Sequence, residues 1–353
     1  MMPLFLRLKS INMKDLWSYL KETSKPIVLY GTGNGADKIY NRLNKDGIEI
    51  SGVFSSSGFK KGKEFYGFNV TSYEDLKAKY NDMIILVCFG SHLESVISNI
   101  LSLKAENELY MPDVPVYGEE IFDICFARDH KEELINVYNN LADEKSRQVF
   151  ENTVYYKITG DIDYLIRCES LYEETVELIK PSEEIYLDLG AFDGDTVKQL
   201  IYWDKNYKKI IAVEPDGRNF KKLTANTANL DNITLLNYAV AENNGIVPMT
   251  KNKGRGNAGQ GRTLEIPALC IDYICDGFFP TFIKMDVEGS ESAAIFGGKN
   301  TIKNKPKMQI ACYHRSEDLF KIPIQVLKIR SDYKIYMRRQ RALPAWDINY
   351  IFV

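Results

Sequence analysis

The stretch IYLDLGAFDGDTV at residues 185–197 decides the fold. An apolar run ends beside an acidic residue, two glycines follow, and apolar residues at helical spacing begin after the second glycine. Glycine lets the backbone turn tightly and approach a ligand, and doubly wound sheets bind ligands at the carboxyl ends of their strands. The stretch therefore predicts a strand, a ligand-binding turn and a helix of an α/β fold.

The charges of this turn indicate which ligand it binds. Dinucleotide folds hold a pyrophosphate with G-x-G-x-x-G, whereas here the spacing is G-x-x-x-G and Asp193 and Asp195 flank Gly194. These carboxylates would repel a diphosphate but not the cationic sulfonium of S-adenosylmethionine, and Asp188 suits the amino group of its methionine moiety. Glu214 follows Gly194 by twenty positions, the usual spacing of a carboxylate that accepts ribose hydroxyls. The expected cofactor contacts are Asp188, Gly190, Ala191, Asp193, Gly194, Glu214 and Pro215.

A second cluster of charged residues follows the apolar run in FIKMDVEGSE at residues 282–291. Lys284 and Asp286 share one strand face at period two, so they can pair and tune each other's proton affinity. His314 follows the next predicted strand and is a candidate general base for an attacking hydroxyl. Glu288 and Glu291 are explained equally well as acids in the first turn of a helix. The predicted catalytic residues are Asp286, His314, Lys284 and Glu288.

The same residues leave a metal ion as an open alternative. Asp286, Glu288 and His314 are residue types that hold Mg²⁺ or Mn²⁺, and a bound cation would acidify an attacking hydroxyl. A divalent metal is therefore possible, but we predict none. The glycine-rich segment KNKGRGNAGQGRTLEIP at 251–267 predicts a mobile loop, in which Arg255 and Arg262 either contact an acidic or phosphorylated substrate or belong to an ordinary surface loop.

A separate strand-and-glycine pattern lies near the start, in KPIVLYGTGNGADKIYNRL at residues 25–43. It predicts a strand at 27–30, a turn and a helix, with further strands at 48–54 and 83–89 and a helix at 72–79. The turn Gly31–Gly35 could present backbone N–H groups to the phosphate of a nucleotide sugar, while a protein partner or a purely structural role remain open. The second strand ends in Ser55, Ser56 and Ser57 instead of an acid, which disfavours NAD.

These patterns predict three parts of the chain. Residues 1–117 form an N-terminal Rossmann-like domain, 118–180 a helical connector or lid with Asp143 as a helix cap, and 181–353 the cofactor-binding domain. In the last part we expect strands at 184–189, 209–214, 233–238, 281–286, 307–313, 333–338 and 347–353. The oligomeric state is not predicted.

The composition disfavours several other classes of protein. The 353 residues carry a net charge of −3, so no positive field would attract nucleic acid. The six cysteines are scattered without a C-x-x-C pair, which argues against structural zinc and favours reduced, cytoplasmic thiols. No apolar run is long enough for a signal peptide or a membrane span. We therefore expect a soluble cytoplasmic protein.

Four motifs resemble the FkbM family of methyltransferases: LDLGAFDGDT at 187–196, VEPDGRNFKKL at 213–223, FIKMDVEGSE at 282–291 and CYHRSEDLFKIP at 312–323. The resemblance covers residues 182–353 and departs at WDINYIFV, residues 346–353, where the family has a Trp-Glu-Thr-like closing strand. It implies a Rossmann-like methyltransferase fold and methyl transfer to oxygen, commonly on a sugar or a secondary metabolite. The N-terminal part resembles small Rossmann-like domains found before acetyltransferases and other enzymes that modify nucleotide-linked sugars or bacterial glycans.

We therefore expect an S-adenosylmethionine-dependent O-methyltransferase that acts on a saccharide or a sugar-containing precursor. A nicotinamide-dependent oxidoreductase is the alternative enzyme, which the absence of G-x-G-x-x-G at Gly190 opposes. An inactive scaffold that binds a nucleotide sugar or glycan is the non-enzymatic alternative. The acidic residues at the predicted strand ends, Asp188, Glu214 and Asp286, oppose it.

Overall fold

The computed structural model describes residues 15–56, 64–251 and 262–353. The first sheet has the strand order β3-β4-β2-β1-β5-β6. Its strands are β1 (Ile27–Tyr30), β2 (Gly52–Phe54), β3 (Glu64–Phe65), β4 (Phe68–Thr71), β5 (Ile84–Val87) and β6 (Glu108–Tyr110), and all pair in parallel except the β3–β4 hairpin. The helices of this part are α2 (Leu16–Glu22), α3 (Asn34–Lys45), α4 (Tyr73–Lys79) and α5 (Glu94–Glu106).

Most of these elements follow the predicted pattern. The strand predicted at 48–54 is correct only from Gly52 onward, and the helix predicted at 72–79 begins at Tyr73 because Ser72 caps it. The β3–β4 hairpin was not predicted. It turns through Tyr66 and Gly67, both with positive φ, which is the backbone of a two-residue hairpin turn.

Five helices follow the first sheet: α6 (Ile124–Asp129), α7 (Lys131–Asn140), α8 (Glu144–Thr159), α9 (Asp163–Ile166) and α10 (Tyr172–Ile179). The prediction that Asp143 caps a helix is confirmed, because its side chain accepts the N–H of Ser146 at 2.8 Å. Helix α8 packs on strand β15 (Ile335–Arg339), and Ser146 Oγ also accepts the N–H of Met337 at 2.9 Å. Helix α8, and to a lesser extent α10, therefore pack against the second sheet, while α9 packs on α8 and α7 on α16.

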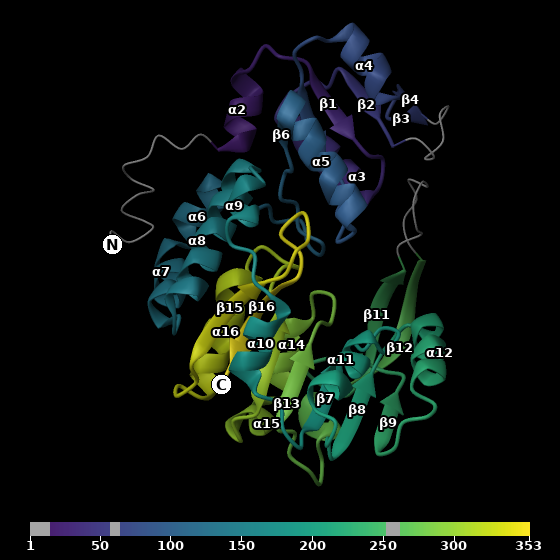
Figure 1. Cartoon of the computed structure of the whole chain (residues 1–353), viewed down its shortest axis with the longest axis vertical. Coiled ribbons are helices and arrows are strands. Elements are labelled where there is room, and N and C mark those ends of the chain that lie inside the picture. Colours follow the sequence, from purple (N-terminus) through teal and green to yellow (C-terminus); the bar gives the residue numbers. More distant parts are fainter. Residues whose placement is uncertain (1–14, 57–63, 252–261) are drawn as a thin grey trace.

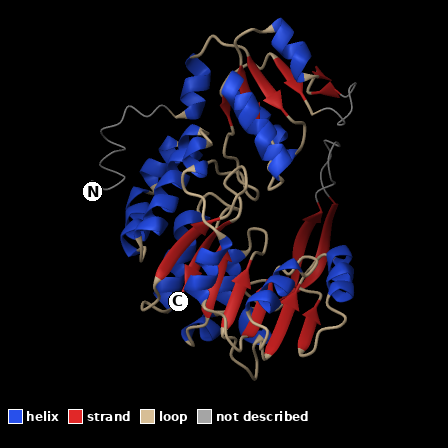
Figure 2. Ribbon diagram, in the orientation of Figure 1, coloured by secondary structure: helices blue, strands red, loops and turns tan. Residues whose placement is uncertain are grey.

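The second sheet has seven strands in the order β15-β16-β14-β13-β7-β8-β9. Besides β15 they are β7 (Ile185–Leu189), β8 (Lys209–Val213), β9 (Ile233–Leu236), β13 (Phe282–Met285), β14 (Lys307–Ala311) and β16 (Ile348–Phe352). β16 runs antiparallel to the other six strands, and the ends of each of the seven strands lie within two residues of the predicted bounds. The helices α11 (Asp195–Trp203), α12 (Gly217–Asn226), α13 (Ile271–Ile274), α14 (Glu291–Gly297), α15 (Lys299–Lys303) and α16 (Asp318–Ile329) flank this sheet (Figure 2).

A third, three-stranded sheet corrects the loop prediction. Strands β11 (Gly245–Lys251) and β12 (Arg262–Leu269) form an antiparallel hairpin, and β12 pairs in parallel with β10 (Ala239–Val240). The prediction of a loop over 251–267 is wrong for residues 262–267, because the segment RTLEIP lies in a paired strand. Arg262 is its first residue, and Arg255 lies outside the described residues.

The two large sheets turn their ligand-binding edges toward each other. In Figure 1 the arrows of β7 and β13 point toward the first sheet. Two backbone hydrogen bonds join Ser91, beyond the carboxyl end of β5, to Leu343 in the loop between β15 and β16, at 2.6 and 2.9 Å. Next to them a Cβ on Gly90 would meet the ring of Trp346 at 2.4 Å. The first sheet therefore packs directly on the loop that closes the second.

Candidate active site

The glycine turn after β7 lies wedged between two neighbouring strands. Gly190 has φ +83°, and a Cβ built on it would lie 1.8 Å from the carbonyl oxygen of Asp286. The N–H groups of Gly190 and Ala191 both donate to Val213 O at the end of β8, at 2.9 and 3.0 Å. Gly194 has φ +91° and opens helix α11. Only glycine fits at position 190, since any side chain would separate β7 from β13.

Asp188 is enclosed beneath this turn. Its Oδ2 accepts the hydroxyl of Thr196 at 2.5 Å, and its Oδ1 lies 3.6 Å from Lys284 Nζ, directly across the β7–β13 pair. Lys284 Nζ also donates to Gly190 O at 2.8 Å. Burial alone lowers the pKa of Lys284, but the carboxylates of Asp188 and Asp286 outweigh it and raise that pKa. Lys284 thus forms its ion pair with Asp188, while the charge of Asp286 acts on its pKa without an ion pair. Asp188 is fully buried, and its contact with the cofactor stays a prediction.

Glu214 follows β8 directly and faces the glycine turn. Its Oε2 accepts the N–H of Phe192 at 3.0 Å and its Oε1 accepts the N–H of Asp216 at 2.8 Å. Burial raises the pKa of this carboxyl group. Asn237 Nδ2 donates to the carbonyl oxygens of Glu214 and Pro215 at 2.7 and 3.2 Å and so fixes the end of the strand. The predicted residues Gly190, Ala191, Asp193, Gly194, Glu214 and Pro215 are thereby gathered at one strand edge, where Asp193 O accepts from Asn226 at 2.8 Å.

His314 is the centre of the cluster at the ends of β13 and β14. Its Nε2 lies 3.4 Å from Asp286 Oδ1 and 3.5 Å from Glu288 Oε2, and its Nδ1 lies 2.9 Å from Glu291 Oε1. The imidazole is 1% exposed. Burial alone lowers the pKa of His314, but Glu291 first, then Asp286 and Glu288, raise it to about 9. Without a further ligand, His314 therefore holds a proton at neutral pH.

The structure also brings in residues that sequence reasoning missed. Tyr117 precedes the helical segment, and its N–H donates to His314 O at 2.9 Å while its ring meets the imidazole edge-on at 6.5 Å. Tyr313 donates its hydroxyl to Asp286 Oδ2 at 3.4 Å. Phe192, in the glycine turn, has a side chain that is 49% exposed beside Glu214. Tyr117 carried no signal in the sequence, because its contact joins positions almost two hundred residues apart.

The glycines of the first sheet have structural explanations. A Cβ on Gly35 would lie 2.4 Å from Cys88 O, and one on Gly31 would lie 2.8 Å from the ring of Phe89. Gly33 caps helix α3 without a side-chain hydrogen bond. Close packing of α3 against the end of β5 therefore accounts for Gly31 and Gly35, and the proposed nucleotide-sugar site there gains no support from side chains.

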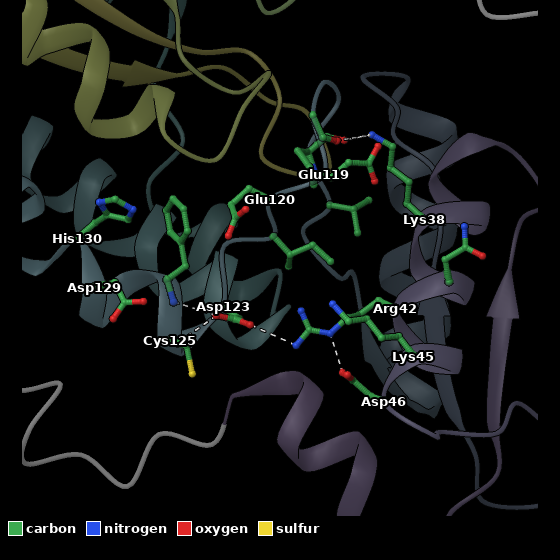
Figure 3. Close-up of a pocket in the computed structure, with 16 residues that line it drawn as sticks. Lys38, Arg42, Lys45, Asp46, Glu119, Glu120, Asp123, Cys125, Asp129 and His130 are labelled. Carbon is green, nitrogen blue, oxygen red and sulfur yellow. Dashed lines mark hydrogen bonds and ion pairs between the residues drawn. The ribbon is translucent and has the colours of Figure 1, made fainter. Parts of the chain in front are cut away.

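A cavity of about 570 Å³ lies apart from both clusters, between α3 and the segment 114–130 (Figure 3). Two of its cations already have partners: Arg42 contacts Asp46 at 2.6 Å and Asp123 at 3.2 Å, and Lys38 Nζ donates to Pro115 O at 2.6 Å. This cavity therefore lies at the interface between the first α/β part and the helices that follow it. Separately, none of the helices in the described ranges is long and apolar enough to cross a membrane.

This site has the features of a methyltransferase-type α/β domain: a glycine turn at the sheet edge and acidic residues at the strand ends. Comparison with known proteins agrees with this class of domain. Residues 188–333 match the family described as Methyltransferase FkbM domain, and residues 23–108 match the family described as C2185-like, N-terminal. The FkbM methyltransferase model thus matches most of the second α/β part, in agreement with the resemblance that its motifs carry.

Two individual proteins illustrate the relationship. The 2-O-methyltransferase NoeI of Sinorhizobium fredii (strain NBRC 101917 / NGR234) is 22% identical over 159 residues, which are 37% of this chain and 64% of that protein, less than two thirds of its length. The crystal structure of Methyltransferase FkbM from Methylobacillus flagellatus KT has a TM-score of 0.75 at 22% identity and covers 99% of this chain and 97% of that one. The predicted fold class, a Rossmann-like methyltransferase fold behind a smaller α/β part and a helical segment, is confirmed.

Proposed function

We propose that the protein is an S-adenosylmethionine-dependent O-methyltransferase. The observation that carries the proposal is the close approach of Gly190 in the glycine turn to the backbone of Asp286. The turn also lies next to Glu214, which follows the neighbouring strand β8. Ligands of doubly wound sheets bind at such an edge. The cofactor and the reacting group would then meet at the adjacent ends of β7 and β13.

The residues present fit the cofactor. Glu214 keeps free lone pairs on both carboxylate oxygens for ribose hydroxyls, beyond the two N–H groups it accepts. The Gly190 cradle has no room for a side chain, and Phe192 offers an exposed ring next to Glu214. We assign Asp188 a supporting role, because it holds Lys284 and Thr196 beneath the turn. S-adenosylmethionine would supply a methyl group bonded to a positively charged sulfur, which leaves as a neutral thioether.

Asp286 is the group that we propose takes the proton of the acceptor hydroxyl. As that hydroxyl oxygen bonds to the methyl carbon and the carbon–sulfur bond breaks, one proton must leave the oxygen. His314 was the other predicted base, but its raised pKa of about 9 makes it a poor proton acceptor at neutral pH in the absence of a further ligand. His314 would instead hold Asp286 and Glu288 in place. Alignment of the hydroxyl by this cluster would supply much of the rate.

The acceptor that we propose is a hydroxyl of a saccharide or of a sugar-containing precursor. The similarity to NoeI, a 2-O-methyltransferase, supports oxygen as the methylated atom. The acceptor would enter between the two sheets, where Tyr117 and the loop around Trp346 border the cluster. Helix α8 packs against the second sheet and α7 on α16, so we place the domain boundary near residue 117 and count the helical segment with the methyltransferase part.

Isothermal titration with S-adenosylhomocysteine tests this proposal, with NAD and a UDP-sugar titrated into the same preparation. Binding of S-adenosylhomocysteine alone supports the methyltransferase. Binding of NAD without S-adenosylhomocysteine would move the assignment to an oxidoreductase. Binding of the UDP-sugar alone would indicate an inactive scaffold.

A further inference from the structure

The His314 ring nitrogen that faces the active-site cluster has an unusual environment. Nε2 is buried and has no hydrogen-bond partner among the described residues, yet two carboxylate oxygens, Asp286 Oδ1 and Glu288 Oε2, face it at 3.4 and 3.5 Å. These distances exceed those of charge-assisted hydrogen bonds, which are about 2.7–2.9 Å. Two carboxylates at this nitrogen favour a positive charge there, which a proton on the ring supplies in the absence of a ligand and which a bound cation would supply in its place.

The distances from Nε2 to the two carboxylate oxygens are close to those between neighbouring metal ligands. Mg²⁺ holds its ligands at about 2.0–2.1 Å in an octahedron, which places neighbouring ligand atoms about 3 Å apart. The two distances at Nε2 are only slightly longer. Ligand atoms of Asp286 and His314, together with Glu291, lie within 4.8 Å of one another, whereas Glu288 is placed at this cluster by its 3.5 Å distance to Nε2. A movement of the exposed Glu288 side chain would bring its carboxylate into the same coordination sphere as Asp286 and Nε2.

Glu291 faces the second ring nitrogen of His314. In metal sites, this nitrogen usually donates to a group that does not itself bind the metal, which we call the outer partner. Its Oε1 lies 2.9 Å from Nδ1 and accepts the N–H of Val287 at 2.9 Å. Metal-binding histidines almost always donate the other ring N–H to such a group, which fixes the tautomer. Glu291 would keep the proton on Nδ1 and leave the Nε2 lone pair for the ion.

The backbone around Glu288 fixes the third ligand. Glu288 has φ +54° and Gly289 φ +88°. A Cβ on Gly289 would lie 2.9 Å from Tyr117, and Arg315 Nε donates to Gly289 O at 2.8 Å. The turn is thus held from two sides in a backbone conformation that brings the Glu288 carboxylate back toward His314, although that side chain is 68% exposed.

We propose that Asp286, Glu288 and His314 Nε2 bind one divalent cation of the Mg²⁺ or Mn²⁺ class, with Glu291 as the outer partner of the histidine. Carboxylates with a single imidazole suit such ions. Three protein ligands leave positions open for oxygens of the acceptor, and two adjacent sugar hydroxyls would fill two of them. The use of the ion rests on the proposed methyltransferase function: it would lower the pKa of the bound hydroxyl, whose proton passes to Asp286 Oδ2.

The test is a titration of the chelator-treated full-length protein with MnCl₂, in which bound Mn²⁺ is followed by loss of the free-ion electron paramagnetic resonance signal. One Mn²⁺ per chain is expected, displaced by Mg²⁺. Glu291→Gln should weaken Mn²⁺ binding roughly 10–100-fold, by analogy with outer-partner variants of known metal sites, and Glu288→Gln, which loses a proposed ligand, should weaken it at least as much. The matched control is Glu242→Gln, an exposed carboxylate of the same domain, which should bind Mn²⁺ like the parent protein.

Thermal unfolding of each variant without metal verifies that it folds. Absence of Mn²⁺ binding at millimolar concentration, or unchanged binding by folded Glu288→Gln, would overturn the cation site. S-adenosylhomocysteine is titrated into the same samples. If it binds and Mn²⁺ does not, only the cation site fails; if Mn²⁺ binds and S-adenosylhomocysteine does not, the cation site stands and the methyltransferase proposal fails.

Discussion

Gly190 and Asp286 meet so closely that a single added methyl group would lie 1.8 Å from the Asp286 carbonyl oxygen. This contact couples the turn that would hold the cofactor to the strand end that would hold the reacting hydroxyl. Neither residue can shift without the other, because β7 and β13 are paired in register up to Leu189 and Met285.

Gly190→Ala should therefore destabilise the protein strongly, by on the order of 4 kcal/mol, because a steric clash adds to the positive φ. Gly47→Ala is the matched control, since Gly47 also has a positive φ, +70°, but open space around its Cβ. We expect it to cost only about 1 kcal/mol. Urea unfolding of both variants measures the difference, and equal losses would show that the contact with Asp286 is unimportant.

Glu214→Ala and Asp286→Ala should separate binding from turnover. Loss of the Glu214 carboxylate removes the proposed ribose acceptor, so the Kd for S-adenosylhomocysteine should rise tenfold or more, equivalent to about 1.4 kcal/mol. Asp286→Ala should leave that Kd nearly unchanged and abolish methyl transfer. Calorimetry gives the Kd, and a methyl-transfer assay gives the turnover. Similar losses of binding in both variants would contradict the assigned roles.

Lys157 should be essential for stability although it lies outside the site. Its Nζ forms a 2.8 Å ion pair with Asp113, and both side chains are buried where the first sheet leads into the segment that carries Tyr117. Lys157→Met leaves the Asp113 charge buried and unpaired, which should cost about 3–5 kcal/mol. Lys198→Met, on the exposed side of α11, is the control. A fall in Tm of similar size for both would refute the importance of the pair.

Asp318 should make stability depend on pH. Burial, followed by the charge of Glu291, raises its pKa from 3.8 to about 7. Because the folded protein then binds this proton more tightly than the unfolded chain, the free energy of unfolding contributed by Asp318 falls as pH rises from about 4 to 7, by up to ~4 kcal/mol. Asp318→Asn removes this loss, so it should gain stability relative to the parent between pH 5 and pH 8.

Urea unfolding at pH 5 and pH 8 checks this expectation. The asparagine oxygen can still accept the N–H of Arg315, which Asp318 Oδ2 accepts at 2.9 Å, so the substitution leaves the local hydrogen bond available. A stability difference between variant and parent that is the same at both pH values would rule out the titration of Asp318 in this range.

The sequence predicts the second sheet well because apolar runs, glycines and acidic strand ends recur at local spacing, as around Asp188 and Glu214. The β11–β12 hairpin was not predicted from the sequence. The glycines at 254–261 indicated a loop, although the residues that follow them lie in a paired strand. The ion-pair partner of Lys284 could not be predicted from spacing along the sequence either. Lys284 and Asp286 share a strand face, yet Lys284 meets Asp188 on the neighbouring strand, which only the register of β7 and β13 determines.

The hydrogen bond from Tyr117 to His314 and the pairing of Ser91 with Leu343 give the first sheet a share in the reaction site of the second. The glycine turn after β7 and Glu214 after β8 are not part of these contacts. Exchange of the first 117 residues for another module would thus replace the border of the proposed acceptor site and leave the proposed cofactor edge intact. Under the proposed function, acceptor specificity would then change with this module while cofactor binding would not.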